Sequence, residues 1–127
     1  MPRYAILLHE MPADSPRPTH WDLMLEDGGV LRTWALAVPP EAGAAIRAGT
    51  LPDHRLDYLT YEGPVSGNRG HVTRWDQGDF QWIERSERSW RISVAGQRLQ
   101  GEIRLTRDET VADDWQVVVA GSSGGGQ

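Results

Sequence analysis

The residues of this sequence best suited to chemistry are His20 and Asp22, two positions apart in the alternating polar and apolar stretch 20–26. In a β-strand, side chains two apart project from the same face. His9 ends an earlier apolar segment, and pairing in a hairpin or with a barrel neighbour could bring it beside them. Two imidazoles and one carboxylate are a common ligand set for a divalent transition metal. The alternative is that these side chains only form hydrogen bonds, with His9 a satisfied histidine at the end of a strand.

A second pair of reactive side chains is His54 and Tyr58, four positions apart. We predict a strand over residues 54–61, which would place both on one face. A histidine beside a tyrosine can supply a proton donor and a contact for a developing oxyanion. The alternative is a core face shared with Leu56, in which Tyr58 exposes only its polar tip.

The elements that must position these residues are short and β-like. Turn signals such as Asp27-Gly28-Gly29, Asp76-Gln77-Gly78 and Ala95-Gly96-Gln97 separate them. The only helix we predict covers residues 41–48, after Pro39-Pro40 and before Gly49. We therefore predict an all-β fold of about eight antiparallel strands, a barrel or a sandwich, with one short helix. The predicted strands are 4–9, 20–26, 30–38, 54–61, 71–75, 79–84, 90–95, 98–106 and 115–120.

Length and composition set further bounds. A chain of 127 residues predicts one domain, over 1–120, followed by a flexible Gly/Ser-rich tail over 121–127. The absence of cysteine excludes disulfides and thiolate metal sites. The first apolar run, 5–8, is too short for a signal peptide or a membrane span, so we expect a cytoplasmic protein with no membrane partner.

The charge balance bears on nucleic-acid binding. The net charge is −5, and all 13 basic residues are arginine. This argues against a broad basic surface that grips duplex DNA. It leaves room for a pocket with a few arginines, because a guanidinium can bind phosphate through two hydrogen bonds at once. A role on nucleic acid must therefore be argued from a site.

The order of motifs along the chain is distinctive. After His9 come His20-Trp21-Asp22-Leu23-Met24-Leu25-Glu26 and Val30-Leu31-Arg32-Thr33-Trp34-Ala35, and then Asp53-His54-Arg55-Leu56-Asp57-Tyr58. Tyr61-Glu62-Gly63, Gly70-His71-Val72, Trp75-Asp76 and Arg98-Leu99-Gln100-Gly101-Glu102 follow. Over residues 4–119 this series resembles the 3′-phosphoesterase domain of bacterial DNA ligase D, here as a free-standing copy.

The resemblance implies a small β-barrel that trims 3′ ends of nucleic acids in nonhomologous end joining, a branch of DNA repair. Members remove a terminal ribonucleoside and then hydrolyse the remaining 3′-phosphate, using manganese. By position, His9, His20 and Asp22 would be the metal ligands, His54 the catalytic or phosphate-contacting histidine, and Tyr58 its polar neighbour. Manganese is the expected metal, with zinc or cobalt as alternatives. Any ligase or polymerase partner would be a separate chain.

The sequence departs from the family pattern at polar positions. Met24 stands where the family has an arginine, on the strand face of His20 and Asp22, so we expect it to face the active site and an arginine there to raise activity if that missing cation limits cleavage. Leu7 stands where the family has a glutamine and Val38 where it has a lysine. The loop between the first two histidines is also longer. Arg47 and Arg55 flank the His54 segment, and we consider them as replacement cations.

Three functions fit these observations. The first is a metal-dependent phosphoesterase, a hydrolase acting on nucleic-acid 3′ ends or on a smaller phosphate ester. The second is a catalytically impaired metal-binding barrel that serves as a nucleic-acid-binding or phosphate-binding accessory module. The third keeps only the barrel. Retention of the three expected ligands with His54 and Tyr58 favours the enzyme, whereas Met24 and Val38 indicate altered substrate handling.

Overall fold

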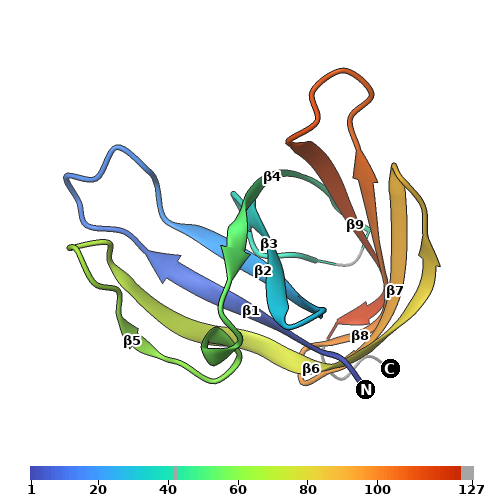
Figure 1. The fold of residues 1–127 in the computed structure, drawn as a ribbon, viewed down its shortest axis with the longest axis horizontal. Coiled ribbons are helices and arrows are strands. Elements are labelled where there is room, and N and C mark those ends of the chain that lie inside the picture. Colours follow the sequence, from blue (N-terminus) through green and yellow to red (C-terminus); the bar gives the residue numbers. More distant parts are fainter. Residues whose placement is uncertain (42, 124–127) are drawn as a thin grey trace.

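The chain forms one antiparallel sheet that closes on itself, as a computed structural model describing residues 1–41 and 43–123 shows (Figure 1). Eight strands form the ring in the order β1-β2-β3-β4-β9-β8-β7-β6, and β1 pairs with β6 to close it. The short strand β5 pairs with β6. The predicted antiparallel barrel is confirmed. The strands are β1 (Arg3–Glu10), β2 (His20–Asp27), β3 (Val30–Leu36), β4 (Ala45–His54), β5 (Gly63–Pro64), β6 (His71–Arg85), β7 (Ser89–Gly96), β8 (Leu99–Arg107) and β9 (Asp114–Ser123).

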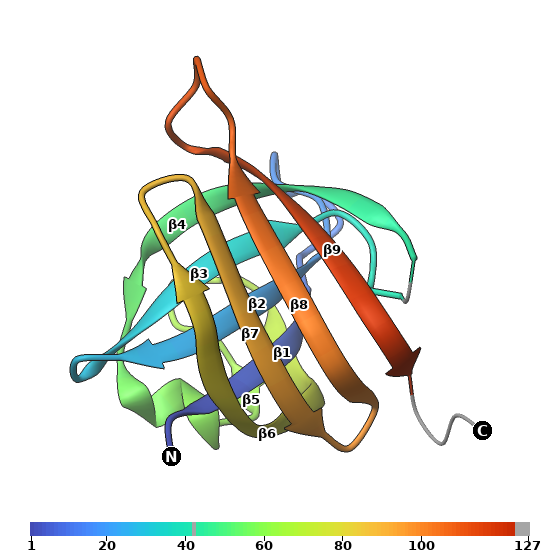
Figure 2. The same cartoon turned by 90° about the vertical axis from the view of Figure 1, so that its right-hand side faces the viewer.

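The interior of the barrel is filled with apolar side chains contributed by all eight ring strands. Figure 2 shows the strands that enclose it, with β7, β8 and β9 in front of β2 and β3. Three tryptophans belong to this core. Trp34 packs edge-on against Trp90 and Trp115, with ring centroids 5.4 and 5.6 Å apart. Burial of these alternating side chains stabilises the ring, because each strand presents one apolar face inward. The interior is a packed core, so a functional site has to lie elsewhere.

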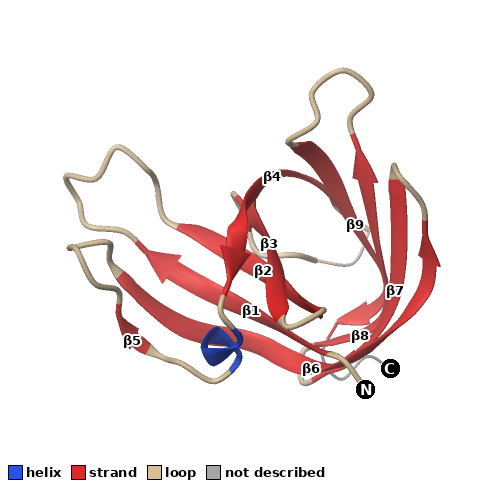
Figure 3. Ribbon diagram, viewed as in Figure 1, coloured by secondary structure: helices blue, strands red, loops and turns tan. Residues whose placement is uncertain are grey.

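A second apolar cluster lies on the opposite face of β1 and β2. Ile6 and Leu23 point into the barrel, whereas Leu7 and Met24 point outward and are as fully buried. Their cover is the segment after β4, which contains the 3-10 helix η1 (Leu56–Leu59), the element drawn in blue in Figure 3. This outer layer is what positions the site described below.

The prediction of a helix over residues 41–48 is wrong. Ala42 lies outside the described residues, and Gly43 has φ +84°, which is incompatible with a right-handed helix. From Ala45 the chain is strand β4, in which Ile46 is buried and Arg47 exposed. The Gly43 amide donates to the Val119 carbonyl and so ties the segment to β9. Pairing with β9 therefore prevailed over a weak two-turn helix signal.

Two further segments differ from the prediction. Residues 54–61 are not a strand, because β4 ends at His54 and η1 follows. The predicted turn at Asp76 lies inside the continuous strand β6. The Asp76 carboxylate accepts hydrogen bonds from the Tyr4 hydroxyl at 2.7 Å and from the backbone amides of residues 97–99 at 2.8–3.1 Å. The Asp76 carboxylate thus holds the turn between β7 and β8 in place.

The C-terminal segment was predicted to leave the fold at Gly121. Strand β9 continues to Ser123, and residues 124–127 lie outside the described residues. Within the described chain, no helix is both long and apolar enough to cross a bilayer.

A candidate metal centre beside a histidine–tyrosine pair

The β1–β2 hairpin brings His9, His20 and Asp22 together. The strand register sets His9 directly opposite His20 and Leu7 opposite Asp22, so the three side chains share the outward face. The two imidazole centroids are 4.8 Å apart. One candidate ligand atom from each residue lies within 4.8 Å of the others. The convergence expected from the sequence is thus present in the fold.

Backbone carbonyls fix the orientation of both imidazoles. His20 Nδ1 lies 3.0 Å from the Pro18 carbonyl oxygen, and His9 Nε2 lies 2.6 Å from the Arg69 carbonyl oxygen. A carbonyl only accepts hydrogen bonds, so these ring nitrogens carry the protons. In the neutral rings, His20 Nε2 and His9 Nδ1 therefore hold the lone pairs. A hydrogen bond from one ring nitrogen that fixes the tautomer in this way is typical of metal-binding histidines.

Both lone-pair nitrogens face the carboxylate of Asp22. His9 Nδ1 is 3.2 Å from Oδ2, and His20 Nε2 is 3.1 Å from Oδ1. The Asp22 side chain is only 4% exposed, and its Oδ1 has no hydrogen bond of acceptable geometry to any described residue. Acceptors that face one another in a buried place require a proton or a cation between them. The donor set and the unpaired oxygen fit a divalent metal, which His9 Nδ1, His20 Nε2 and Asp22 would hold.

Without a metal, a proton on His9 can supply part of the positive charge that the Asp22 carboxylate attracts. The contact with the Asp22 carboxylate raises the pKa of His9 above its ordinary 6.5. Burial alone would raise the pKa of Asp22, but the contacts with His20 and His9 outweigh it, and the pKa lies below the ordinary 3.8. The carboxylate is thus ionised at neutral pH and attracts a positive charge, either a protonated His9 or a cation.

The position of the Arg69 carbonyl, which accepts from His9 Nε2, depends on one glycine. Gly70 has φ +87°, and a Cβ there would lie 2.0 Å from the Glu10 carbonyl oxygen. Only glycine lets the chain pass so close to β1. The Gly70 carbonyl also accepts the Val65 amide at 2.8 Å, which closes the loop that carries Arg69. Gly70 therefore places the Arg69 carbonyl against His9.

A cavity of about 670 Å³ opens over the three-residue cluster. His54 and Tyr58 line it as well, so the structure brings both predicted pairs into one cavity. Their rings meet edge-on with centroids 5.4 Å apart. The predicted proximity is therefore present, but it arises from the end of β4 and the η1 turn. The cavity is lined by Leu7, His9, Met11, Pro12, Asp14, Ser15, Pro16, Arg17, His20, Asp22, Leu51, Pro52, Asp53, His54, Tyr58, Val65, Asn68, Arg69 and Val72.

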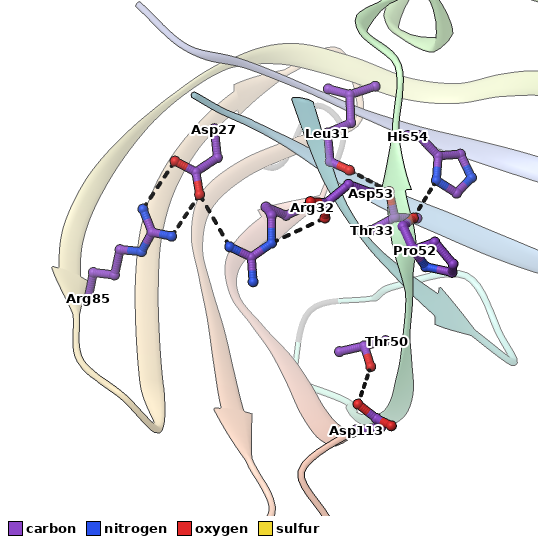
Figure 4. A network of polar contacts seen from close by, with 10 residues as sticks. All are labelled: Asp27, Leu31, Arg32, Thr33, Thr50, Pro52, Asp53, His54, Arg85 and Asp113. Atoms are coloured by element: carbon purple, nitrogen blue, oxygen red, sulfur yellow. Dashed lines mark hydrogen bonds and ion pairs between the residues drawn. The ribbon is translucent and has the colours of Figure 1, made fainter. Parts of the chain in front are cut away.

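The imidazole of His54 is oriented in the same manner as the other two. Its Nδ1 donates to the Pro52 carbonyl oxygen at 2.8 Å (Figure 4), so Nε2 holds the lone pair in the neutral ring. The neighbouring Asp53 carboxylate pairs with Arg32 at 3.4 Å. Arg32 also contacts Asp27, which Arg85 binds at 2.7 Å. These charges balance one another at the end of β4.

The positions that depart from the family pattern lie away from the cavity, with the exception of Leu7. Met24 is fully buried in the outer apolar cluster and does not line the cavity, contrary to the expectation that it faces the active site. Val38 is half exposed beyond the end of β3. Arg47 lies outside the cavity and pairs with Asp114, and Arg55 is exposed before η1. Neither of these arginines lines the site.

Sequence reasoning missed the arginines that do line the cavity. Among the described residues these are Arg17 and Arg69. Arg17 Nη2 lies 3.4 Å from His20 Nε2. The signal available in the sequence was the long proline-containing loop between His9 and His20, with Arg17 three residues before the second histidine.

The sequence of the chain is similar to known protein domains. The family model of the DNA ligase D 3′-phosphoesterase domain matches residues 10–107. The chain is 30% identical over 117 residues to the multifunctional non-homologous end joining protein LigD of Pseudomonas aeruginosa, covering 83% of this chain and 13% of that protein. It is likewise 30% identical over 108 residues to the LigD protein of Mycobacterium bovis, covering 78% of this chain and 14% of the relative. The chain thus spans about one seventh of these relatives.

Proposed function

Because the chain belongs to the DNA ligase D 3′-phosphoesterase family, we propose that it is a metal-dependent phosphoesterase that hydrolyses phosphate esters at nucleic-acid 3′ ends. The relatives are multifunctional end-joining proteins by name. We extend to this chain the role of processing DNA ends for that kind of repair, with an end-joining ligase or polymerase as its partner.

One observation supports this function above the others. His9 Nδ1, His20 Nε2 and an unpaired Asp22 oxygen face one another, each imidazole turned to this orientation by a backbone carbonyl. A purely structural hydrogen-bonded cluster would give each of these acceptors a donor, and Asp22 Oδ1 has none among the described residues. The proposed ligands are therefore His9, His20 and Asp22, and manganese is the metal we expect, with zinc or cobalt as alternatives.

A bound divalent ion would polarise a phosphate oxygen and offset the charge that develops during hydrolysis. The residues of the chain supply the rest. His54, with Nδ1 committed to the Pro52 carbonyl, can present a proton from Nε2 to the leaving oxygen when the ring is protonated. Tyr58, edge-on to that ring, limits how the imidazole can turn and offers a hydroxyl to a phosphate oxygen.

The test is hydrolysis of an oligonucleotide that ends in a 3′-phosphate, with and without Mn²⁺. We expect phosphate release that depends on Mn²⁺ and is lost in Asp22→Asn. Asp14→Asn is a matched control, because Asp14 lines the same cavity outside the ligand cluster. Binding of Mn²⁺ without hydrolysis would instead favour the impaired accessory module. Hydrolysis that is equally fast with a chelator present would refute the metal-dependent mechanism.

A further inference from the structure

The cavity beside the candidate metal centre is lined by two guanidinium groups that differ in what they bind. Arg69 is committed to its own loop: its Nε donates to the Ser66 carbonyl at 2.7 Å, and Nη2 contacts the Ser66 hydroxyl at 3.2 Å. Arg17 has no carboxylate partner within residues 1–41 and 43–123. Its side-chain contact is with His20 Nε2, at 3.4 Å. Arg17 is thus the cavity cation that remains available to a ligand.

The backbone around Arg17 is restricted. Pro16 and Pro18 flank it, and a residue before proline is confined to extended conformations. The Arg17 amide donates to the Ser15 hydroxyl at 3.1 Å, and the Pro18 carbonyl accepts from His20 Nδ1. The same short segment therefore orients His20 and carries the Arg17 side chain across its Nε2 face.

The contact between Arg17 and His20 is replaceable. The Nη2 group donates toward the lone pair that a metal would take, over a distance at the long limit for a hydrogen bond. Once that lone pair is engaged, the guanidinium needs another acceptor. A phosphate oxygen in the cavity would lie beside both the metal ligands and Arg17.

We propose that Arg17 is the phosphate-binding residue of this site and that it gives the site a preference for a dianionic terminal phosphate over a singly charged phosphodiester. This inference rests on the proposed function. A divalent ion with two neutral imidazoles and the Asp22 carboxylate has a net charge of +1. A terminal phosphate brings about −2 at neutral pH, so one further cation is required, whereas a diester of charge −1 is already balanced. Of the other charged side chains of the lining, Asp53 is paired with Arg32, Asp14 is exposed to solvent, and the Arg69 guanidinium is held on its own loop by Ser66.

Binding of two small probes to the Mn²⁺-loaded protein tests the proposal without requiring turnover. Inorganic phosphate represents the dianion and dimethyl phosphate the diester, with affinities measured by titration calorimetry at pH 8. In Arg17→Met, phosphate should bind about 10–100-fold more weakly, the change expected on losing a charge-assisted hydrogen bond. Dimethyl phosphate affinity should change by less than about threefold. Arg17→Lys should retain part of the preference, because it keeps the charge without the planar fork.

Arg55→Met is the matched control, since it removes the same charge from an exposed arginine next to His54 that does not line the cavity. It should retain the phosphate preference of the natural protein. Equal losses for phosphate and dimethyl phosphate in Arg17→Met would overturn the proposal, as would loss of Mn²⁺ binding, which would make Arg17 a support of His20. If the natural protein prefers phosphate and Arg17→Met loses that preference, but the natural protein fails to hydrolyse 3′-phosphate ends, the role of Arg17 is supported and the proposed function is refuted. A natural protein with no preference for the dianion would refute the role of Arg17 even if it hydrolyses the ester.

Discussion

Asp22→Asn changes one atom type at the centre of the ligand cluster and keeps the size of the side chain. In the metal-free protein, His9 and Asp22 are 12% and 4% exposed, so solvent screens their contact little. The contact raises the pKa of His9, and its stabilisation is therefore fully present below pH 6.5 and is lost as the pH rises through the higher folded pKa. At pH 6 the substitution should cost about 1.5–3 kcal/mol, the value of a hydrogen bond to a charged group.

At pH 9, chosen to lie above the raised pKa of His9, the effect should be smaller. His9 is neutral there, and its Nδ1 lone pair and that of His20 both face a carboxylate. The amide of asparagine brings a donor to one of these acceptors. The cost should therefore shrink below about 1 kcal/mol or become a gain. At about 3–5 °C per kcal/mol for a chain of this length, the fall in melting temperature is about 5–15 °C at pH 6 and close to zero at pH 9.

The same variant should also lose the stabilisation given by metal. Excess Mn²⁺ at about 100 times its dissociation constant adds about 2.7 kcal/mol to the natural protein. Losing a ligand should weaken binding at least about 100-fold, more than the loss of a hydrogen bond that orients a ligand, so nearly all of this gain disappears. Thermal melts at pH 6 and 9, with and without Mn²⁺ and with Asp14→Asn alongside, measure all these terms. An equal loss of stability at both pH values, or an unchanged response to Mn²⁺, would refute the assignment of acceptor atoms.

Three other perturbations test separate parts of the site. His54→Ala should lower turnover on a 3′-phosphate end by about 10²–10⁴-fold and leave the Mn²⁺ affinity unchanged; a parallel fall in metal content would contradict a role in proton transfer. Met24→Arg should lower the free energy of unfolding in urea by at least about 2–4 kcal/mol, because Met24 is fully buried among apolar side chains. Met24→Leu should cost less than about 1.5 kcal/mol. A soluble Met24→Arg variant that is as stable as the natural protein and more active would instead support the expectation that this side chain faces the active site. Mn²⁺ binding should weaken about tenfold per pH unit below the raised pKa of His9, since a proton must leave its ring; calorimetry that detects no proton release at pH 6 would contradict this coupling.

The sequence was sufficient to predict the half of the site carried by strands. His20 and Asp22 share a face because of the two-residue period, and the polar turn after β2 identifies the β2–β3 hairpin. The position of His9 depends on the register of the β1–β2 pair, which a loop of unusual length separates. The resemblance to a family suggested that this register brings His9 to His20, and the structure has the two directly opposite.

The other half of the site could not be predicted from local pattern. His54 and Tyr58 were assigned to one strand, and they meet because η1 turns the chain back over the outer face of β1. Local periodicity does not report such a tertiary turn. Met24 illustrates the same limit. The two-residue period predicts that it points outward from β2, but not that the segment after β4 covers it. Arg17 lies in a loop, where its contact with His20 depends on long-range packing.

The central claim is that three specified atoms form a metal site, and a crystal structure of the Mn²⁺-loaded protein tests it most directly. We predict one ion bonded to His9 Nδ1, His20 Nε2 and an oxygen of Asp22, each at about 2.0–2.3 Å. His9 Nε2 and His20 Nδ1 should remain hydrogen-bonded to the carbonyls of Arg69 and Pro18. An ion bound through the opposite ring nitrogens, or found only at other carboxylates while this cluster stays hydrogen-bonded, would contradict the account.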